Sequence, residues 1–248
     1  MRRENAYLER VGLLVGEDVL ARLGEIRVLL FGAGGVGSWC AEGLVRSGVR
    51  HLTLVDADVI SESNVGRQLM ATPRTVGQVK VEALRDRLLE VAPDAEITVL
   101  QKIFSAETAD EFAMEGYDYI LDAIDSLKDK GELILRATRT PAKFFCSMGA
   151  ACKVDPTQVK VGEFWNVRGC PLGAALRKKF KQNHTWPGRK FRCVYDEEVL
   201  PNRGGEGKAE TDLFNKAQIN GALVHITAMF GMTLAGLVIE DVYHQIVG

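Results

Sequence analysis

Short apolar runs alternate with amphipathic stretches along the first 150 residues of the chain. Each run is three to five residues long, and the runs lie at 27–31, 52–55, 97–100, 119–121 and 144–146. Stretches between them, such as 36–47 and 79–91, carry apolar residues at helical spacing and end near a glycine or a proline. Strands and helices in this alternation form right-handed crossovers. The pattern therefore predicts an α/β fold with a Rossmann-like, doubly wound, mostly parallel sheet.

The pattern changes after Gly149. Two segments, 159–165 and 191–195, are predicted to be strands, and they flank a basic insertion that contains several glycines and prolines. The polar segment 201–208 predicts a mobile loop. The segment 219–239 has no formally charged residue over 21 residues, which is long enough to span a membrane. Its polar residues and three glycines favour a buried or subunit-interface helix instead.

Composition and charge narrow the class of protein. The chain is 46% hydrophobic and 26% charged, as in an ordinary soluble protein, and its formal charge is only −2. A polyanionic partner would therefore need a local basic patch. The five cysteines include no C-x-x-C pair, which argues against a zinc ribbon or a disulfide framework. The N-terminus lacks the apolar core of a signal peptide, so we expect a cytoplasmic protein.

A glycine-rich motif follows the first predicted strand and opens the next helix. Its glycines are Gly32, Gly34, Gly35 and Gly37. Such glycines permit a tight turn and close approach of a phosphate to the helix N-terminus. Asp56 ends the second predicted strand, 19 residues after Gly37, where a carboxylate can accept ribose hydroxyls. The motif indicates a nucleotide; the alternative is a glycine turn that only packs helix against sheet.

A long polar loop after Asp56 contains further candidates. They are Ser63, Asn64, Arg67 and Gln68, with Lys80 beyond them. Guanidinium and ammonium groups neutralise phosphate oxygens, and amides hydrogen-bond them, so this set suits a triphosphate better than a dinucleotide. For any one of these residues alone, a solvated loop or helix surface is the simpler interpretation.

Acidic residues follow the fourth predicted strand, at the same edge of the sheet. Mg²⁺ usually takes one or two carboxylates besides phosphate oxygens and waters. We therefore predict Asp125 as a magnesium ligand, with Ser126 beside it at the nucleotide. Asp122 is left between a site role and a helix cap.

Several motifs follow one another in a distinctive order and spacing: the glycine motif, Asp56-x-Asp58, Ser63-Asn64-x-x-Arg67-Gln68, Lys80 and Asp122-x-x-Asp125. Together they resemble the adenylating domain of the ThiF superfamily. That superfamily includes ubiquitin-activating E1 enzymes and bacterial enzymes of molybdopterin and thiamine biosynthesis. The resemblance runs from about Tyr7 to Tyr243 and implies ATP as the nucleotide. It also implies a homodimer in which Arg10 acts in trans. We expect one domain over 1–248: a helical arm (1–25), a nucleotide-binding core (26–150), a substrate-side basic region (151–216) and a C-terminal helix (217–248).

Within the superfamily, the chain is similar to the tRNA threonylcarbamoyladenosine dehydratases. The residues that carry this similarity are Gly149, 155–159, Pro171-Leu172 and 177–179. The resemblance implies ATP-dependent cyclisation of the threonylcarbamoyl group at adenosine 37 of tRNA. It also implies a monovalent cation, K⁺ or Na⁺, without assigning residues to it, and leaves a sulfurtransferase-system partner open. The segment 196–198 departs from the family, which often has a serine-led sequence there.

A local basic region provides independent support for RNA. The segment 164–195 has no acidic residue, whereas the rest of the chain has 23 basic and 33 acidic residues. Its eight basic residues are Arg168, Arg177, Lys178, Lys179, Lys181, Arg189, Lys190 and Arg192. Phe180, His184, Trp186 and Phe191 lie among them as predicted stacking faces. A solvated helix face, or a surface for a small acidic partner, would explain the same charges.

The sequence is therefore consistent with three candidate functions. The first is the tRNA dehydratase, with Arg10, Arg67, Lys80 and Asp125 as the catalytic charges around the phosphates. The second is adenylation of the C-terminus of a ubiquitin-like sulfur carrier, although relatives of that kind generally carry two C-x-x-C zinc pairs. The third is a nucleotide- or NAD-binding protein without catalysis. A thioester role for Cys193 is conceivable, but a buried cysteine is favoured.

Overall fold

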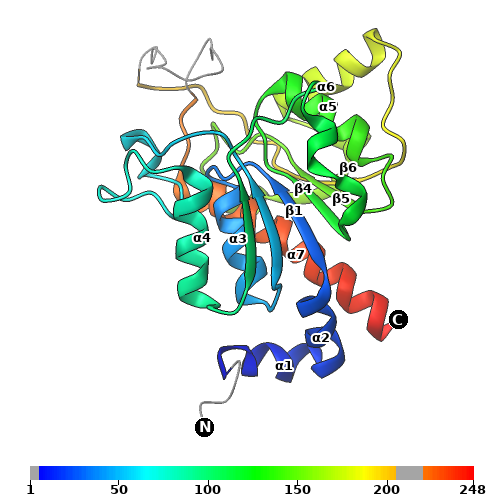
Figure 1. The fold of residues 1–248 in the computed structure, drawn as a ribbon. Helices are drawn as coiled ribbons and strands as arrows, with labels where there is room; N and C mark the ends of the chain where they lie inside the picture. The colour runs from blue at the N-terminus through cyan, green and yellow to red at the C-terminus, as the bar shows by residue number, and fades with distance from the viewer. Residues whose placement is uncertain (1–5, 205–219) are drawn as a thin grey trace.

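The computed structural model describes residues 6–204 and 220–248, and a seven-stranded sheet runs through its centre (Figure 1). The strand order is β3-β2-β1-β4-β5-β7-β6. The strands are β1 (Arg27–Phe31), β2 (His51–Val55), β3 (Glu96–Leu100), β4 (Tyr119–Asp122), β5 (Lys143–Ser147), β6 (Lys160–Glu163) and β7 (Arg192–Tyr195). All neighbours are parallel except β6 and β7. The predicted α/β class with a mostly parallel sheet is confirmed.

Helices cover both faces of the sheet. They are α1 (Glu9–Val15), α2 (Glu17–Glu25), α3 (Gly37–Arg46), α4 (Lys80–Val91), α5 (Leu127–Ala137), α6 (Pro171–Gln182) and α7 (Val224–Val247). The described residues also contain short 3-10 turns in the connections: η1 (Ala6–Leu8), η2 (Glu62–Asn64), η3 (Ala109–Phe112), η4 (Met114–Gly116), η5 (Pro156–Gln158) and η6 (Phe164–Asn166). α3, α4 and α7 pack on one face, and α5 and α6 pack on the other.

Burial on both faces explains why the central strands read as continuous apolar runs. Along β1, Val28 and Leu30 belong to the core under α3 and α7, whereas Leu29 and Phe31 belong to the core under α5 and α6. Neighbouring side chains of a strand point to opposite faces, so a strand covered on both sides has no polar position to spare.

The long apolar helix α7 is a core helix. Ile226, Phe230, Leu234 and Val238 are buried, and α7 lies so close to α3 that a Cβ at Gly231 would come within 2.4 Å of the Val36 carbonyl oxygen. By length and composition α7 could cross a membrane. Packing against α3 and the sheet buries one face of α7, as the favoured interpretation predicted. Met229 and Met232 are exposed on the helix, so a role of the exposed face at a subunit interface stays a prediction.

The boundaries of three predicted segments differ from the structure or lie beyond its described part. The predicted loop 201–208 extends into residues 205–219, which lie outside the described residues. The predicted start of the last helix at 217 is wrong, because residues 220–223 are not helical and α7 begins at Val224 after the extended Leu223. The strand predicted over 159–165 is shorter, because the Glu163 side chain accepts a hydrogen bond from the Trp165 N–H (3.1 Å) and starts the turn η6.

The topology determines where a ligand can bind. Because β1, β2, β4, β5 and β7 are parallel, the segments that follow them meet at one edge of the sheet. α1 and α2 precede β1 and lie at the opposite end (Figure 1).

Candidate functional site

The glycine loop between β1 and α3 is a tight turn with an open surface. Gly32 has φ +93°, and a Cβ on it would come within 2.8 Å of the Ala123 carbonyl oxygen. A Cβ at Gly37 would lie 1.7 Å from the Gly32 carbonyl oxygen. A Cβ at Gly34 would meet nothing nearer than the Gln68 amide nitrogen at 4.0 Å. Gly32 and Gly37 are therefore required by packing, whereas Gly34 leaves room for a ligand.

The Asp56 side chain, at the end of β2, is hydrogen-bonded to the glycine loop. Its carboxylate accepts hydrogen bonds from the Ala33 N–H (2.7 Å) and from the Asp58 N–H (2.9 Å). Burial raises the pKa of Asp56, and the Lys80 ammonium and these N–H groups oppose that rise. The residue connects the glycine loop to the cation beside it.

Lys80 is brought to the site by a small antiparallel bridge. Val59 pairs with Val79, and the Lys80 N–H donates to the Asp58 carbonyl oxygen (3.0 Å). The Lys80 ammonium then pairs with the Asp58 carboxylate at 2.6 Å, and the Lys80 side chain is only 8% exposed. A buried ammonium beside the glycine loop is placed to meet phosphate oxygens.

The polar loop 61–68 docks on the first turn of α3. Asn64 is buried and accepts the Ser61 N–H (3.1 Å), and the Arg67 carbonyl accepts from the Trp39 indole (3.2 Å). The Arg67 guanidinium donates to the Ser63 carbonyl (2.9 Å). Gln68 is buried, and its Oε1 has no hydrogen-bond partner within the described chain. Asn64 and the Arg67 guanidinium are thus used within the loop, whereas Gln68 lies beside Gly34 with an unsatisfied side-chain oxygen.

The acidic pair after β4 divides into two roles. Asp122 is fully buried and accepts from the Lys130 ammonium (2.9 Å), the Ile124 N–H (2.9 Å) and the Cys146 thiol (3.3 Å). It is a structural anchor, and the cap of α5 is Ser126, whose hydroxyl accepts the Asp129 N–H at 3.4 Å. The alternative of Asp122 as a helix cap is wrong, because Ser126 occupies that position. Asp125 is exposed at the sheet edge.

Arg10 lies on α1, which precedes the sheet, so the length of β1 separates it from its own glycine loop (Figure 1). A role for Arg10 at the nucleotide therefore requires a second copy of the chain.

The eight basic residues of the insertion fall into two groups. Lys179 of α6 donates to the Lys128 carbonyl (3.5 Å), three residues from Asp125, and so connects α6 to the candidate site. The Arg168 and Arg177 guanidinium groups donate to carbonyls of the turn η6. Lys178 and Lys181 are exposed on the same helix, α6. Arg189, Lys190 and Arg192 lie toward the opposite end of the sheet. Arg189 donates to carbonyls at the end of α5, and Arg192 pairs with Glu240 (2.7 Å).

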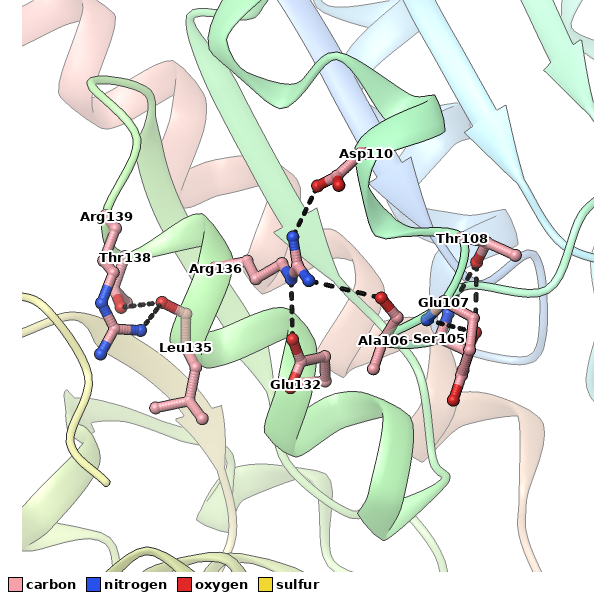
Figure 2. A network of polar contacts seen from close by, with 10 residues as sticks. All are labelled: Ser105, Ala106, Glu107, Thr108, Asp110, Glu132, Leu135, Arg136, Thr138 and Arg139. Atoms are coloured by element: carbon pink, nitrogen blue, oxygen red, sulfur yellow. Dashed lines mark hydrogen bonds and ion pairs between the residues drawn. The ribbon is translucent and has the colours of Figure 1, made fainter. Parts of the chain in front are cut away.

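Two arginines near the end of α5 hold neighbouring segments in place by hydrogen bonds and ion pairs. Figure 2 shows Arg136 bonded to Asp110 (2.6 Å) and Glu132 (2.7 Å), which secures the segment before β4. At the other side of the same view, Arg139 donates to the Leu135 carbonyl. Outside this view, Arg139 also donates to the Trp186 carbonyl (3.0 Å). Sequence reasoning did not include Arg139, because it lies outside the acid-free segment.

Only part of the predicted aromatic surface exists. Phe180 and Phe191 are buried at 1% and 5% exposure, so the expectation that they offer stacking faces is wrong. They pack against Phe164 in the core under α6. Trp186 is 48% exposed beside Trp165, and His184 is exposed. Cys193 is fully buried on β7, as the favoured interpretation predicted.

Comparisons with known proteins agree with this geometry. The family model described as ThiF family matches residues 8–245. The chain is 34% identical to a tRNA threonylcarbamoyladenosine dehydratase of Haemophilus influenzae over 250 residues, covering 97% of this chain and 95% of the relative. It is 36% identical to the dehydratase of Bacillus subtilis over 239 residues, covering 94% and 93%.

Among solved structures, the dehydratase of Escherichia coli in complex with ATP superposes with a TM-score of 0.86 at 28% identity, covering 98% of each chain. The glycine turn, the cation beside it and the acidic segment after β4 thus occur in a fold whose relative has been solved with ATP. This chain belongs to the ThiF family of adenylating enzymes and, within it, groups with the tRNA threonylcarbamoyladenosine dehydratases.

Proposed function

We propose that this protein uses ATP to dehydrate and cyclise N6-threonylcarbamoyladenosine at position 37 of tRNA. The observation that carries the proposal is the convergence of an open Gly34, a buried Lys80 and an exposed Asp125 at one edge of the sheet. Relatives with this name span nearly the whole chain, and the Escherichia coli protein has been solved with ATP and with AMP.

The first step is adenylation. A carboxylate oxygen of the threonyl group attacks the α-phosphorus, and pyrophosphate leaves. Both reacting groups are negatively charged, so the site must supply positive charge that is already in position. Lys80 supplies it beside Asp56, which holds the glycine loop, and Arg67 is proposed to add a second cation from the loop that docks on the first turn of α3.

The second step is ring closure. The carbamoyl nitrogen or oxygen of the same substrate attacks the acyl carbon, AMP leaves with one former carboxylate oxygen, and the carbamoyl group loses a proton. An intramolecular nucleophile has a high effective concentration, so the enzyme has no need of a nucleophilic side chain. The burial of Cys193 agrees with this route.

Magnesium is the second proposed cofactor, with Asp125 as its protein ligand. The described residues contain no group of three or more histidine, cysteine or acidic side chains that could hold a metal alone. Mg²⁺ fits such a site, because it typically takes one or two carboxylates and fills its shell with phosphate oxygens and waters. When bound, it would neutralise phosphate charge. A monovalent cation, K⁺ or Na⁺, stays a prediction to which we assign no residues.

A homodimer would complete the site with Arg10 from the partner. Leu13 and Leu14 are 82% and 83% exposed on α1, and their positions three and four residues after Arg10 put them on its face of the helix. Such exposed leucines favour a protein contact. A sulfurtransferase-system partner stays a prediction without a surface that we can name.

The proposed RNA surface begins at α6. Lys179 connects this helix to the start of α5 near Asp125, and Lys178 and Lys181 extend the positive charge outward. A second group, Arg139 with Trp186 and Lys190, lies toward the opposite end of the sheet, where the Arg139 guanidinium donates to the Trp186 carbonyl (3.0 Å). A substrate of this kind is consistent with the cytoplasmic location that we propose.

Exchange of labelled pyrophosphate into ATP tests the function. We expect exchange with tRNA that carries the threonylcarbamoyl group, and none with tRNA that lacks it. Exchange that instead requires a small ubiquitin-like protein would favour the sulfur-carrier alternative, and no exchange with either substrate would reject catalysis. Asp125→Ala should abolish exchange while preserving the melting temperature, whereas Asp86→Ala, another exposed aspartate change, should preserve both.

The partner role of Arg10 has its own test. Arg10→Ala and Lys80→Ala should each lose about a hundredfold in rate, and refolding them together should restore about a quarter of the wild-type rate, because half of the random dimers are mixed and each keeps one complete site. No recovery in a mixture that forms dimers would place Arg10 outside the site.

A further inference from the structure

A buried lysine joins the loops that follow β5 and β7. The Lys153 side chain is only 2% exposed, and its ammonium donates to the main-chain carbonyls of Asp196 (3.1 Å) and Glu198. The Asp196 carboxylate, fully buried, lies 3.8 Å from the same ammonium. Carbonyl oxygens around a compact positive charge with a carboxylate nearby are also the surroundings that a monovalent cation takes in a protein.

These contacts do not fill the hydrogen-bonding capacity of the Asp196 carboxylate. One of its oxygens accepts the Glu198 N–H (2.7 Å), and the other is buried without a hydrogen-bond partner within the described residues. A buried charge of this kind is tolerated only beside an opposite charge. The Lys153 ammonium is that charge, so removing it leaves a pocket that attracts a cation.

The joined loops lie at the sheet edge that carries the candidate site. Glu198 returns the contact through its side chain, which accepts the Val154 N–H (2.6 Å) and the Asp155 N–H (3.1 Å). The Leu200 N–H also donates to the Cys152 carbonyl (2.9 Å). The two loops therefore form one unit.

This unit reaches the glycine loop through the first turn of α7. The His225 side chain is bonded to the Val154 carbonyl (2.9 Å). Two residues further, the Thr227 side chain lies 3.2 Å from the position that a Cβ on Gly35 would take. A shift of Lys153 would thus be transmitted to the nucleotide loop and to the substrate side of the sheet.

We propose that Lys153 is a positioning residue that acts as a tethered cation. Its ammonium holds the loops 148–155 and 196–200 together at the substrate side, and a free K⁺ or NH₄⁺ can occupy the place of that ammonium when the side chain is removed. The functional part of this inference rests on the proposed tRNA reaction, whereas its structural part does not.

Three variants separate the charge from the packing. Lys153→Ala opens the pocket, Lys153→Met fills it with an uncharged stem of similar length, and Lys153→Gln keeps a donor without the charge. Melting temperature is measured without RNA in KCl, NH₄Cl or tetramethylammonium chloride at equal ionic strength, because tetramethylammonium is too large to enter. Turnover on modified tRNA is measured in the same salts.

We expect Lys153→Ala to melt at a lower temperature than the wild type in tetramethylammonium chloride and to recover in KCl or NH₄Cl. Its kcat should fall by about a hundredfold, as for a misplaced reacting group, with little change in the KM for ATP, and should recover in the same two salts. Lys153→Met should not recover in any salt, and the wild-type melting temperature should differ little among the salts.

A Lys153→Ala variant that folds but shows no shift in melting temperature among the salts would overturn the proposal. If this variant is not recovered folded, Lys153→Gln decides, because wild-type turnover by that variant would show that the charge is dispensable. The melting arm requires no tRNA activity, so failure of the proposed function would leave a salt-dependent melting shift intact and the two failures can be told apart.

Discussion

The Lys80 ammonium lies 2.6 Å from the Asp58 carboxylate, although the two residues are separated by 22 positions in the chain. The bridge between Val59 and Val79 brings them together. Asp58 thus holds Lys80 in position beside Asp56 and the glycine loop before any phosphate is present. A cation that is already oriented stabilises the transition state without reorganisation during the reaction.

Replacement of Lys80 by alanine should therefore lower the adenylation rate. We expect a loss of about a hundredfold, or roughly 3 kcal/mol of barrier, as for removal of one oriented oxyanion donor. Pyrophosphate exchange measures the rate. Lys102→Ala, which removes an exposed lysine that pairs with Glu111, should leave the rate unchanged. Exchange by Lys80→Ala at the wild-type rate would exclude Lys80 from the chemistry.

The glycines of the loop should respond differently to the same substitution. Gly37→Ala would force a Cβ to within 1.7 Å of the Gly32 carbonyl oxygen, so we expect it not to fold. Gly34→Ala meets nothing nearer than the Gln68 amide nitrogen at 4.0 Å and should change stability by less than about 0.5 kcal/mol, while weakening ATP binding because the methyl group occupies the ligand side. Thermal melting and calorimetric titration with ATP separate the two effects. Tight ATP binding by Gly34→Ala would argue that phosphates lie elsewhere.

Neutralising α6 should weaken tRNA binding and reduce its dependence on salt. Each lost phosphate contact reduces the slope of log K against log salt by about 0.7 to 0.9, so Lys178, Lys179 and Lys181 together account for about 2 to 3. Filter binding of the triple glutamine variant at several salt concentrations measures this slope. A matched triple change of Arg85, Lys102 and Lys160 retains the wild-type slope if α6 is the contact surface. Equal slopes for both triple variants would move the RNA surface away from α6.

The strands and the glycine turn could be predicted from sequence because both depend on local rules. β1 reads as apolar because both of its faces are buried, and Gly32 and Gly37 are required by contacts within the turn and with the loop after β4. The partners of the charged residues could not be predicted in the same way. Whether Asp122 faces a ligand or a buried lysine depends on where α5 returns over the sheet, which no local pattern encodes.

The same limit explains the aromatic residues and Lys153. In the sequence, Phe180 and Phe191 lie among basic residues and are therefore predicted to be exposed stacking faces. In the structure, their positions on α6 and beside β7 point both side chains into the core. Lys153 carries no local signal, because its partners are the main-chain atoms of residues 43 and 45 positions away.

The buried pair of Lys130 and Asp122 should govern stability rather than catalysis. Burial alone would lower the pKa of Lys130, but the Asp122 carboxylate, together with the neighbouring Cys146 and Cys193, raises this pKa above the ordinary value of 10.5. A folded-state pKa above the unfolded value means that the contribution of Lys130 is complete below 10.5 and is lost as pH rises through the folded-state pKa. Asp122→Asn leaves a buried, unpaired ammonium, and we expect a loss of roughly 3 to 5 kcal/mol at neutral pH.

The pH dependence distinguishes this explanation from a simple packing defect. Without the carboxylate the main group that opposes burial is gone, so the folded-state pKa of Lys130 should fall below 10.5, and the lost stability should return as pH rises from that lowered pKa toward 10.5. Urea unfolding between neutral pH and 10.5 measures it. The double variant Asp122→Asn with Lys130→Met removes both charges and should be more stable than Asp122→Asn alone, without the rise with pH. A single variant that stays equally unstable over this range would show that packing, and not an unpaired ammonium, causes the loss.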